Sequence, residues 1–240
     1  MGRGSRGVKP RSRVRRAFRK IFLWAAVALG AAIVASSVQV VSARLINMPF
    51  TMTMLIEWTK GAPFPWPGLR STWRSLDHIC PELRLAVLAA EDQRFLDHRG
   101  FDMMEIRAVL REAASGGGIR GASTITMQTA RTLFLTTARS IWRKAAEAWY
   151  TLLMELMWSK ARILETYLNT VDWGPAGRGA ERASRHYFNT SADQLTSEQA
   201  ALLAAVLPSP YRWSPVLPDE FLLRRQRRIL NQMYRMPLVQ

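Results

Sequence analysis

The sequence predicts a mainly α-helical protein that is preceded by one transmembrane helix. Residues 21–43 contain no charged side chain, and 23 residues are enough to span a hydrocarbon core of about 30 Å. Beyond residue 70, apolar side chains recur at steps of three and four, the period of a helix that buries one face. The sustained polar–apolar alternation of half-buried strands does not occur there. These observations together favour the helical class.

The distribution of charge predicts how the chain lies across the membrane. Of the formal net charge of +16, nine Lys or Arg residues fall within residues 1–20, which leaves +7 for the other residues. A basic flank beside an apolar span marks the cytoplasmic side. We therefore interpret residues 1–20 as a basic cytoplasmic tail, residues 21–43 as the transmembrane helix and residues 44–240 as the domain outside the cytoplasm. Because membrane topology accounts for much of the basic charge, the sequence predicts no nucleic-acid partner.

An uncleaved anchor competes with a cleaved signal peptide, since residues 41–43 resemble a cleavage site. The apolar region of a signal peptide is about 7–15 residues long, and this one is longer. We favour the anchor. After it, residues 44–69 are rich in Met and aromatic side chains and include a Pro-rich stretch at residues 62–67. Directly after an anchor, this composition predicts a surface that rests in the lipid interface.

Glu91 is the first candidate catalytic residue. Residues 81–90 read as a helix, with Pro81 suited to its first turn, so Glu91 lies where the helix ends. The negative end of the helix dipole and partial burial would both raise the pKa of this carboxyl group, as a general acid or base requires. The alternative is that Glu91 is a surface acid that forms an ion pair with Arg94.

The residues after Glu91 predict a tight turn into a second helix. Asp102 has the position of an N-cap, with Glu105 as the third residue of a helix over residues 103–114. His98 then falls in the turn, where we expect it to stabilise the turn through a hydrogen bond. The three His residues form no metal-ligand cluster in the sequence, and the single Cys80 excludes an intrachain disulfide.

The segment that begins at Glu91 resembles the first signature of the peptidoglycan glycosyltransferases (glycosyltransferase family 51), which polymerise glycan strands from lipid II. It reads Glu91-Asp92-x-x-Phe95-x-x-His98-x-Gly100-x-Asp102. The match holds at every fixed position of that signature. The resemblance implies that Glu91 is catalytic and that Asp92 and His98 belong to the substrate site.

A glycine-rich loop at residues 115–122 leads to a second helix start. From the residues alone, Ser123 and Thr124 are either simple caps or part of a phosphate site at unpaired backbone N–H groups. Residues 121–126 resemble the second family signature, and the resemblance implies substrate binding by Ser123, Thr124, Thr126, Gln128 and Arg131. The family usually has Gln and Asn where this chain has Met127 and Thr132.

Residues 139–159 form the strongest helical pattern in the chain. One face is apolar, and Lys144, Glu147, Thr151 and Glu155 form a polar stripe, which is usually a solvated salt-bridge stripe. Arg143-Lys144-x-x-Glu147 resembles the third family signature. The resemblance implies that Glu147 is the second catalytic carboxylate, and two cations one turn before it suit a diphosphate leaving group.

The remaining signatures are assigned to the scaffold. Residues 159–169 resemble the fourth signature, and we expect Glu165 and Asn169 to fix the fold around the site. A capping box at residues 196–199 predicts a helix over residues 200–207, and residues 208–215 resemble the fifth signature. The last helix is rich in arginine, for which we expect anionic lipid headgroups or diphosphate as contacts.

The resemblance covers about residues 45–235 and is nearest to the monofunctional biosynthetic members of Gram-negative bacteria, with no penicillin-binding domain expected. It implies a lysozyme-like fold with a small membrane-associated lobe, in the inner membrane with a periplasmic catalytic domain. The implied reaction is transfer from undecaprenyl diphosphate to the GlcNAc 4-hydroxyl of lipid II, with inversion. Implied partners are lipid II, the growing strand and other cell-wall synthesis or division proteins. No cofactor is certain, and Mg or Mn is left open.

Two alternatives belong to other functional classes. Paired carboxylates on such a scaffold could hydrolyse glycan, which would make the chain a membrane-anchored lytic enzyme. The anchor and the basic residues around Glu147 favour the transferase, because a hydrolase needs neither a lipid-side entrance nor a diphosphate site. An inactive cell-wall scaffold is the other alternative, which Met127 and Thr132 motivate.

Overall fold

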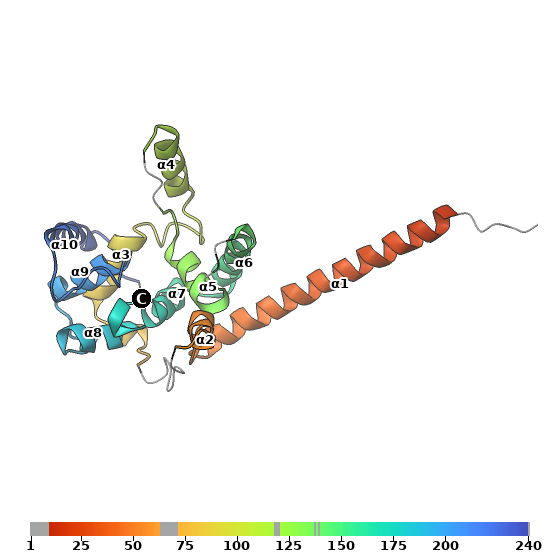
Figure 1. The fold of residues 1–240 in the computed structure, drawn as a ribbon. Helices are drawn as coiled ribbons and strands as arrows, with labels where there is room; N and C mark the ends of the chain where they lie inside the picture. The colour runs from red at the N-terminus through yellow and green to blue at the C-terminus, as the bar shows by residue number, and fades with distance from the viewer. Residues whose placement is uncertain (1–9, 63–71, 118–120, 137, 139, 240) are drawn as a thin grey trace, which may run out of the picture. The chain divides into compact units, whose positions relative to one another are not determined.

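The computed structural model describes residues 10–62, 72–117, 121–136, 138 and 140–239, and these residues form helices and no strand (Figure 1). The mainly α class that the sequence predicts is therefore confirmed. The helices, in chain order, are α1 (Pro10–Leu45), α2 (Met52–Thr59), η1 (Leu76–His78), α3 (Pro81–Glu91), α4 (Met103–Ala114), α5 (Ile125–Phe134), α6 (Ile141–Met157), α7 (Lys160–Thr170), η2 (Gly174–Ala176), α8 (Ala180–Phe188), α9 (Ser197–Val206) and α10 (Glu220–Met233).

The chain divides into two compact units, residues 1–42 and residues 43–240, and each is described by itself. Helix α1 provides the described part of the first unit. Its segment Arg15–Leu45 contains an 18-residue stretch with a mean hydropathy of 2.2 and is long and apolar enough to cross a membrane. The helix extends beyond the predicted span at both ends, because its flanks are compatible with a helix and Pro10 occupies the first turn. This finding is compatible with a single-pass anchor.

Helices α3, α9 and α10 pack against one another and form one half of the core of the second unit. Helix α9 is built mainly from small residues, and its Ala200, Ala201, Ala204 and Ala205 are all fully buried. Small side chains allow the neighbouring helices to approach closely. The predicted capping box at Thr196 is present, and the helix starts at once after this cap, earlier than the predicted residue 200.

The other half of the core is formed by α5, α6 and α7, with α5 packed against both of the others. Helix α7 carries the two residues that we expected to fix the fold. The Asn169 side chain accepts a hydrogen bond from the Arg74 amide and donates one to its carbonyl oxygen, each at 2.8 Å. Glu165 accepts from the Trp73 indole and from the Leu76 amide, each at 3.1 Å. These bonds tie the segment that leads into α3 to α7.

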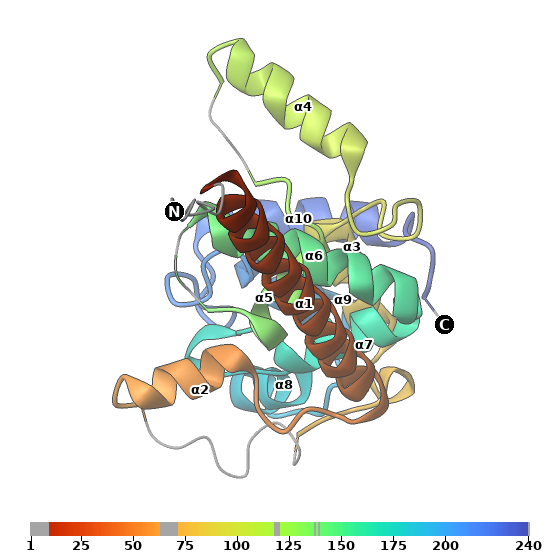
Figure 2. The same cartoon turned by 90° about the vertical axis from the view of Figure 1, so that its right-hand side faces the viewer.

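Helix α6 places its polar stripe inward and much of its apolar face outward. Glu147 and Thr151 are fully buried, whereas Trp142 is 82% exposed and Leu156 is 68% exposed. The usual interpretation of such a stripe, as a solvated one, is therefore wrong for this helix. Exposed apolar side chains also occur on α2 and on α4, which projects from the other helices in both views (Figures 1 and 2). The predicted Pro-rich stretch lies mostly outside the described residues.

A close backbone contact fixes the loop between α9 and α10. Gly174 has a φ of +76°, and a Cβ atom there would lie 2.0 Å from the carbonyl oxygen of Pro210. No other residue type fits at this distance without a shift of the loop. The loop that resembles the fifth signature is therefore held against η2. The predicted glycine-rich loop at residues 115–122 is only partly described, since residues 118–120 lie outside the described residues.

Candidate active site

A polar cavity of about 780 Å³ lies between the end of α3, the start of α5 and the facing side of α10. Its walls come from segments far apart in the sequence: the α3–α4 turn, the residues before α5, the end of α9 and one arginine of α10. The lining side chains include Glu91, Asp92, Gln93, Arg94, Asp102, Glu105, Ser123, Thr124, Gln128, Arg131 and Arg225. This cavity combines acids, amides and cations in one enclosed space.

Glu91 is the last residue of α3, as the sequence predicts, and only 13% of its side chain is exposed. Its Oε2 accepts a hydrogen bond from Gln128 Nε2 at 3.0 Å, and Arg225 Nη2 lies 3.7 Å from its Oε1. Burial raises the pKa of Glu91, and the Gln128 hydrogen bond and the Arg225 and Arg131 charges oppose this rise. A raised pKa is the direction of shift that a carboxyl group needs to act as a general acid or base.

The predicted alternative, in which Glu91 is a surface acid paired with Arg94, is wrong. The Arg94 guanidinium donates instead to both carboxylate oxygens of Asp102. Asp102 also accepts from the amides of Met104 and Glu105 and so caps α4, as predicted. Burial acts to raise the pKa of Asp102, but the Glu105 amide and Arg94 outweigh it and lower the pKa.

Gln128 is held in place by a tyrosine from α7. The Tyr167 hydroxyl donates to Gln128 Oε1 at 3.3 Å, which leaves the Gln128 amide directed toward Glu91. Burial raises the pKa of Tyr167 well above its ordinary value, so the hydroxyl keeps its proton and remains a donor. The sequence contains no local signal for this Tyr–Gln–Glu series, because its three members lie on three different helices.

Asp92, His98 and Thr124 connect the α3–α4 turn to the start of α5. Asp92 accepts from the Ile125 amide at 3.0 Å and pairs with His98 Nε2 at 2.9 Å. The Thr124 hydroxyl donates to the Gly100 carbonyl at 2.6 Å and accepts from the Met127 amide. The amides of Ile125 and Met127 are therefore already paired, which favours the cap over the phosphate site at these two amides. His98 makes the turn hydrogen bond that we expected.

Asp92, His98 and Asp102 bring potential metal-ligand atoms within 4.8 Å of one another, a grouping that the sequence analysis did not predict. Their donor set does not fit a divalent cation. Asp102 already binds the positive Arg94, and Asp92 accepts from the Ile125 amide and pairs with His98. We therefore assign no metal-dependent chemical step to these residues.

A second ionic cluster lies on α6, away from the lining of this cavity. Glu147 is fully buried, and its two oxygens accept from Arg143 Nη1, at 2.5 Å, and from Lys144 Nζ. The Arg143 side chain is 17% exposed and that of Lys144 is 44% exposed, so both cations reach toward solvent from a buried anchor. The cluster carries one surplus positive charge.

Helix α5 connects the cavity to this cluster. It supplies Gln128 to Glu91 and packs against α6, where the Thr126 hydroxyl donates to Glu155 Oε1 at 2.6 Å. Thr126 is fully buried and does not line the cavity. Arg131, one turn beyond Gln128, does line it.

Comparison with known proteins agrees with this geometry. A sequence model described as "Transglycosylase" matches residues 64–234. The chain belongs to the transglycosylase family. It is 46% identical to the biosynthetic peptidoglycan transglycosylase of Shewanella oneidensis over 91% of this chain and 93% of the relative. It is 42% identical to the protein of that name from Pseudomonas aeruginosa, over 94% of each. The family resemblance that the sequence signatures predict is confirmed.

The cavity of this transglycosylase contains only part of the predicted site. Of the predicted residues, it brings together Glu91, Asp92, Ser123, Thr124, Gln128 and Arg131. It does not include His98, Thr126 or the Arg143–Lys144–Glu147 cluster. The sequence analysis missed Arg225 at Glu91, because nothing in the local sequence distinguishes it from the other arginines of the last helix. The roles of all these residues in substrate binding and catalysis stay predictions.

The raised pKa of Glu91 predicts a stability change in this transglycosylase. The folded state binds the Glu91 proton more tightly than the unfolded state, so ionisation costs stability as the pH rises above 4.5. Glu91→Gln removes this cost. We expect the Tm difference between variant and parent to be near zero at pH 4 and to grow to a gain of a few degrees by pH 8, since about 1 kcal/mol shifts Tm by about 2–4 °C at this size.

Thermal unfolding of the detergent-solubilised full chain, followed by tryptophan fluorescence across this pH range, measures the difference. Glu198→Gln is the control, because Glu198 is an exposed glutamate at the start of α9. It should show no such gain with rising pH. A Glu91→Gln variant that loses stability relative to the parent as the pH rises would contradict the expected effect of burial.

Proposed function

We propose that this transglycosylase polymerises lipid II into peptidoglycan glycan strands in cell-wall biosynthesis. The observation that carries the proposal is the buried Glu91, with a raised pKa, at one end of a polar cavity that also holds Arg131 and Arg225. The names of the relatives, biosynthetic peptidoglycan transglycosylases, support it. A carboxyl group with a raised pKa beside cations suits a reaction that moves a proton from a sugar hydroxyl and releases a diphosphate.

In the proposed reaction Glu91 acts as the general base. Its carboxylate takes the proton of the GlcNAc 4-hydroxyl as that oxygen attacks C1 of the growing strand. The bond from C1 to the diphosphate oxygen breaks, and the undecaprenyl diphosphate leaves with the electron pair. Attack opposite the leaving group inverts the α linkage to β-1,4. Gln128, itself held by Tyr167, fixes the orientation of the carboxylate.

The departing diphosphate needs positive charge that is in place before the bond breaks. Arg131 lines the cavity, and Arg143 and Lys144 lie on α6, the helix packed against the one that carries Arg131. The buried Glu147 holds these last two cations in fixed positions. Cations positioned in advance stabilise developing charge without the cost of reorganisation. In this proposal Glu147 assists departure through these cations.

We place the protein in the bacterial inner membrane, with residues 1–20 in the cytoplasm, residues 21–43 as the anchor and residues 44–240 as the periplasmic catalytic domain. The apolar length of α1 and the basic residues before it support this topology. The outward apolar face of α6, with Trp142, Trp149, Leu152 and Leu156, would rest against lipid. The lipid tails of both substrates would reach the site from that side.

The topology has a direct test. If residues 21–43 remain as an anchor, N-terminal sequencing of protein extracted from membranes should begin at the start of the chain. A mature N-terminus at Arg44 would identify a cleaved signal peptide instead. The basic flank and the uncharged length of 23 residues are the reasons for the expected result.

Incubation of the full chain with labelled lipid II tests the reaction and the role of Glu91. The parent should produce polymer, and Glu91→Gln should reduce the rate by about 10²–10⁴-fold, the usual contribution of a general base. Release of fragments from preformed glycan would indicate the lytic hydrolase, and the absence of both products would indicate the scaffold. A folded Glu91→Gln variant that polymerises at the parental rate would exclude Glu91 as the base.

The basic cluster on α6 is tested by Lys144→Met. Lys144 is nearly half exposed, so its loss should cost little stability, whereas turnover should fall by about tenfold or more if it stabilises the leaving diphosphate. Glu147→Gln should reduce both turnover and Tm, because Glu147 is buried with two cations. The double variant should lose less than the product of the two single losses.

Lys60→Met, at the exposed end of α2, serves as the control for the loss of one lysine charge. The control should keep the parental turnover number. If Lys144→Met also keeps it, and the two substitutions in the cluster act independently, the cluster has a structural role only.

A further inference from the structure

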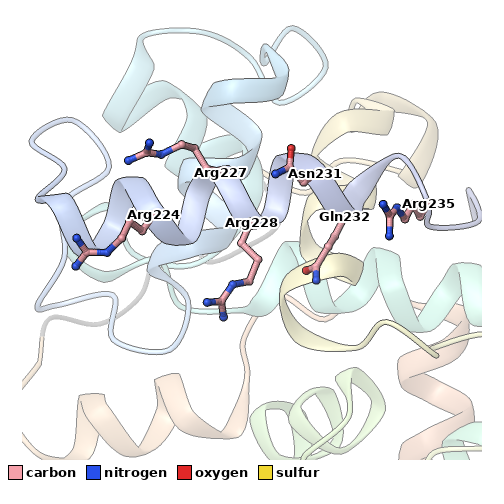
Figure 3. A pocket seen from close by; sticks show the side chains of 6 residues that line it. All are labelled: Arg224, Arg227, Arg228, Asn231, Gln232 and Arg235. Atoms are coloured by element: carbon pink, nitrogen blue, oxygen red, sulfur yellow. The ribbon is translucent and has the colours of Figure 1, made fainter.

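The outer face of α10 forms an open, basic groove of about 510 Å³ (Figure 3). Its lining residues are Arg224, Arg227, Arg228, Asn231, Gln232 and Arg235. Arg224, Arg228 and Gln232 follow one another at steps of four and, with Arg235, point to one side of the helix, while Arg227 and Asn231 point to the other. From Arg224 to Gln232 the groove follows α10 for about 12 Å, given a rise of about 1.5 Å per residue.

The positive charge of this groove is largely uncompensated. Glu220 is the only acid in α10, and it pairs with Arg224 at 2.6 Å. Arg228 and Arg235 have no acidic partner in the part of the chain that the structure describes, and Arg227 donates only to a carbonyl oxygen of its own helix. Like charges one turn apart destabilise a helix, so the groove is complementary to an anionic group supplied from outside.

The groove adjoins the active-site cavity. Gln93, which lines the cavity, donates a hydrogen bond to Gln232, which lines the groove, at 3.1 Å. Arg225 lines the cavity beside Glu91, and Arg228 lies one turn further along the same helix. The groove thus begins on the side of Glu91, where the proposed function places the acceptor sugar.

The position of the groove argues against a diphosphate or a lipid headgroup as its ligand. Helix α10 lies on the far side of the second unit from α6 in Figure 1, with α3, α9 and α5 drawn between them. Helix α6 carries the exposed apolar face that we place against lipid, and the diphosphates are attached to lipid tails. A group of lipid II that reaches the flank of α10 would therefore be one that extends from its sugars and not from its lipid tail. The peptide stem that each disaccharide of peptidoglycan carries ends in free carboxylates.

We propose that the basic groove of α10 binds the carboxylates of the peptide stem of the acceptor lipid II. This inference rests on the proposed function. Guanidinium groups bind carboxylates through two parallel hydrogen bonds, and the exposed arginines of the groove offer this geometry. The groove would hold the peptide stem of the acceptor while the acceptor sugar lies at Glu91. The enzyme would then prefer lipid II whose stem carries free, negatively charged carboxylates.

The test uses the full chain with Arg228 and Arg235 both changed to Gln, two exposed residues outside the catalytic machinery. The KM for lipid II with free stem carboxylates should rise by about fivefold or more, while the turnover number should stay within about twofold, as expected for lost ground-state binding. With lipid II whose stem carboxylates are amidated, the parent should already show the higher KM, and the substitutions should add nothing. Arg182→Gln, an exposed arginine on α8, is the control.

Two further measurements separate the outcomes. A soluble fluorescent stem peptide should bind the parent more tightly than the double variant, and its amidated form should bind neither. Equal KM changes with both forms of lipid II, or no binding of the peptide, would overturn the proposal. Loss of binding to phosphatidylglycerol vesicles in the variant would also overturn it, in favour of headgroups. If the parent makes no polymer, the proposed function fails, and the peptide titration alone decides this inference.

Discussion

A carboxylate held out of water at the C-terminal end of α3 is the constraint on which the rest of the site depends. Glu91 can remain buried only because groups from two other helices approach it: Gln128 from α5 and Arg225 from α10. Their compensation is incomplete, so burial still raises the pKa of the carboxyl group. Ionised Glu91 therefore lowers the free energy of unfolding, at the position where the proposed chemistry needs a proton acceptor.

The two predicted catalytic carboxylates, Glu91 and Glu147, have different hydrogen-bond and charge partners. Glu91 has one amide donor and a cation at 3.7 Å, whereas Glu147 has two cations in direct contact. Both carboxylate oxygens of Glu147 already accept hydrogen bonds from these cations, so neither faces a substrate hydroxyl. The same arrangement makes it a good anchor for those cations. The structure thus supports different proposed roles for two residues that a sequence reading describes in similar terms.

The helix ends and the turn that precedes the second helix could be predicted from sequence, because their hydrogen bonds join residues two to eight positions apart. The caps at Asp102 and Thr196 and the position of Glu91 at the end of α3 are of this kind. The pairs that define the cavity were not predictable in this way. Gln128 lies 37 residues from Glu91, and Arg225 is one of four arginines in a single helix. Only tertiary packing decides which arginine faces inward, and the same holds for the inward polar stripe of α6.

The alanines of α9 are buried in a helix that packs against both the helix that ends in Glu91 and the helix that carries Arg225, which also contact each other. Ala205 also accepts a hydrogen bond from Arg225 Nε at 3.1 Å, so α9 touches the catalytic neighbourhood directly. A larger side chain at one of these buried positions would push α9 away from its neighbours and so shift Arg225, one of the charges that oppose the raised pKa of Glu91. The acidity of the site thus depends in part on the close packing of a helix that supplies no charge to it. Attempts to thermostabilise this domain by enlarging its core would retune its pH optimum.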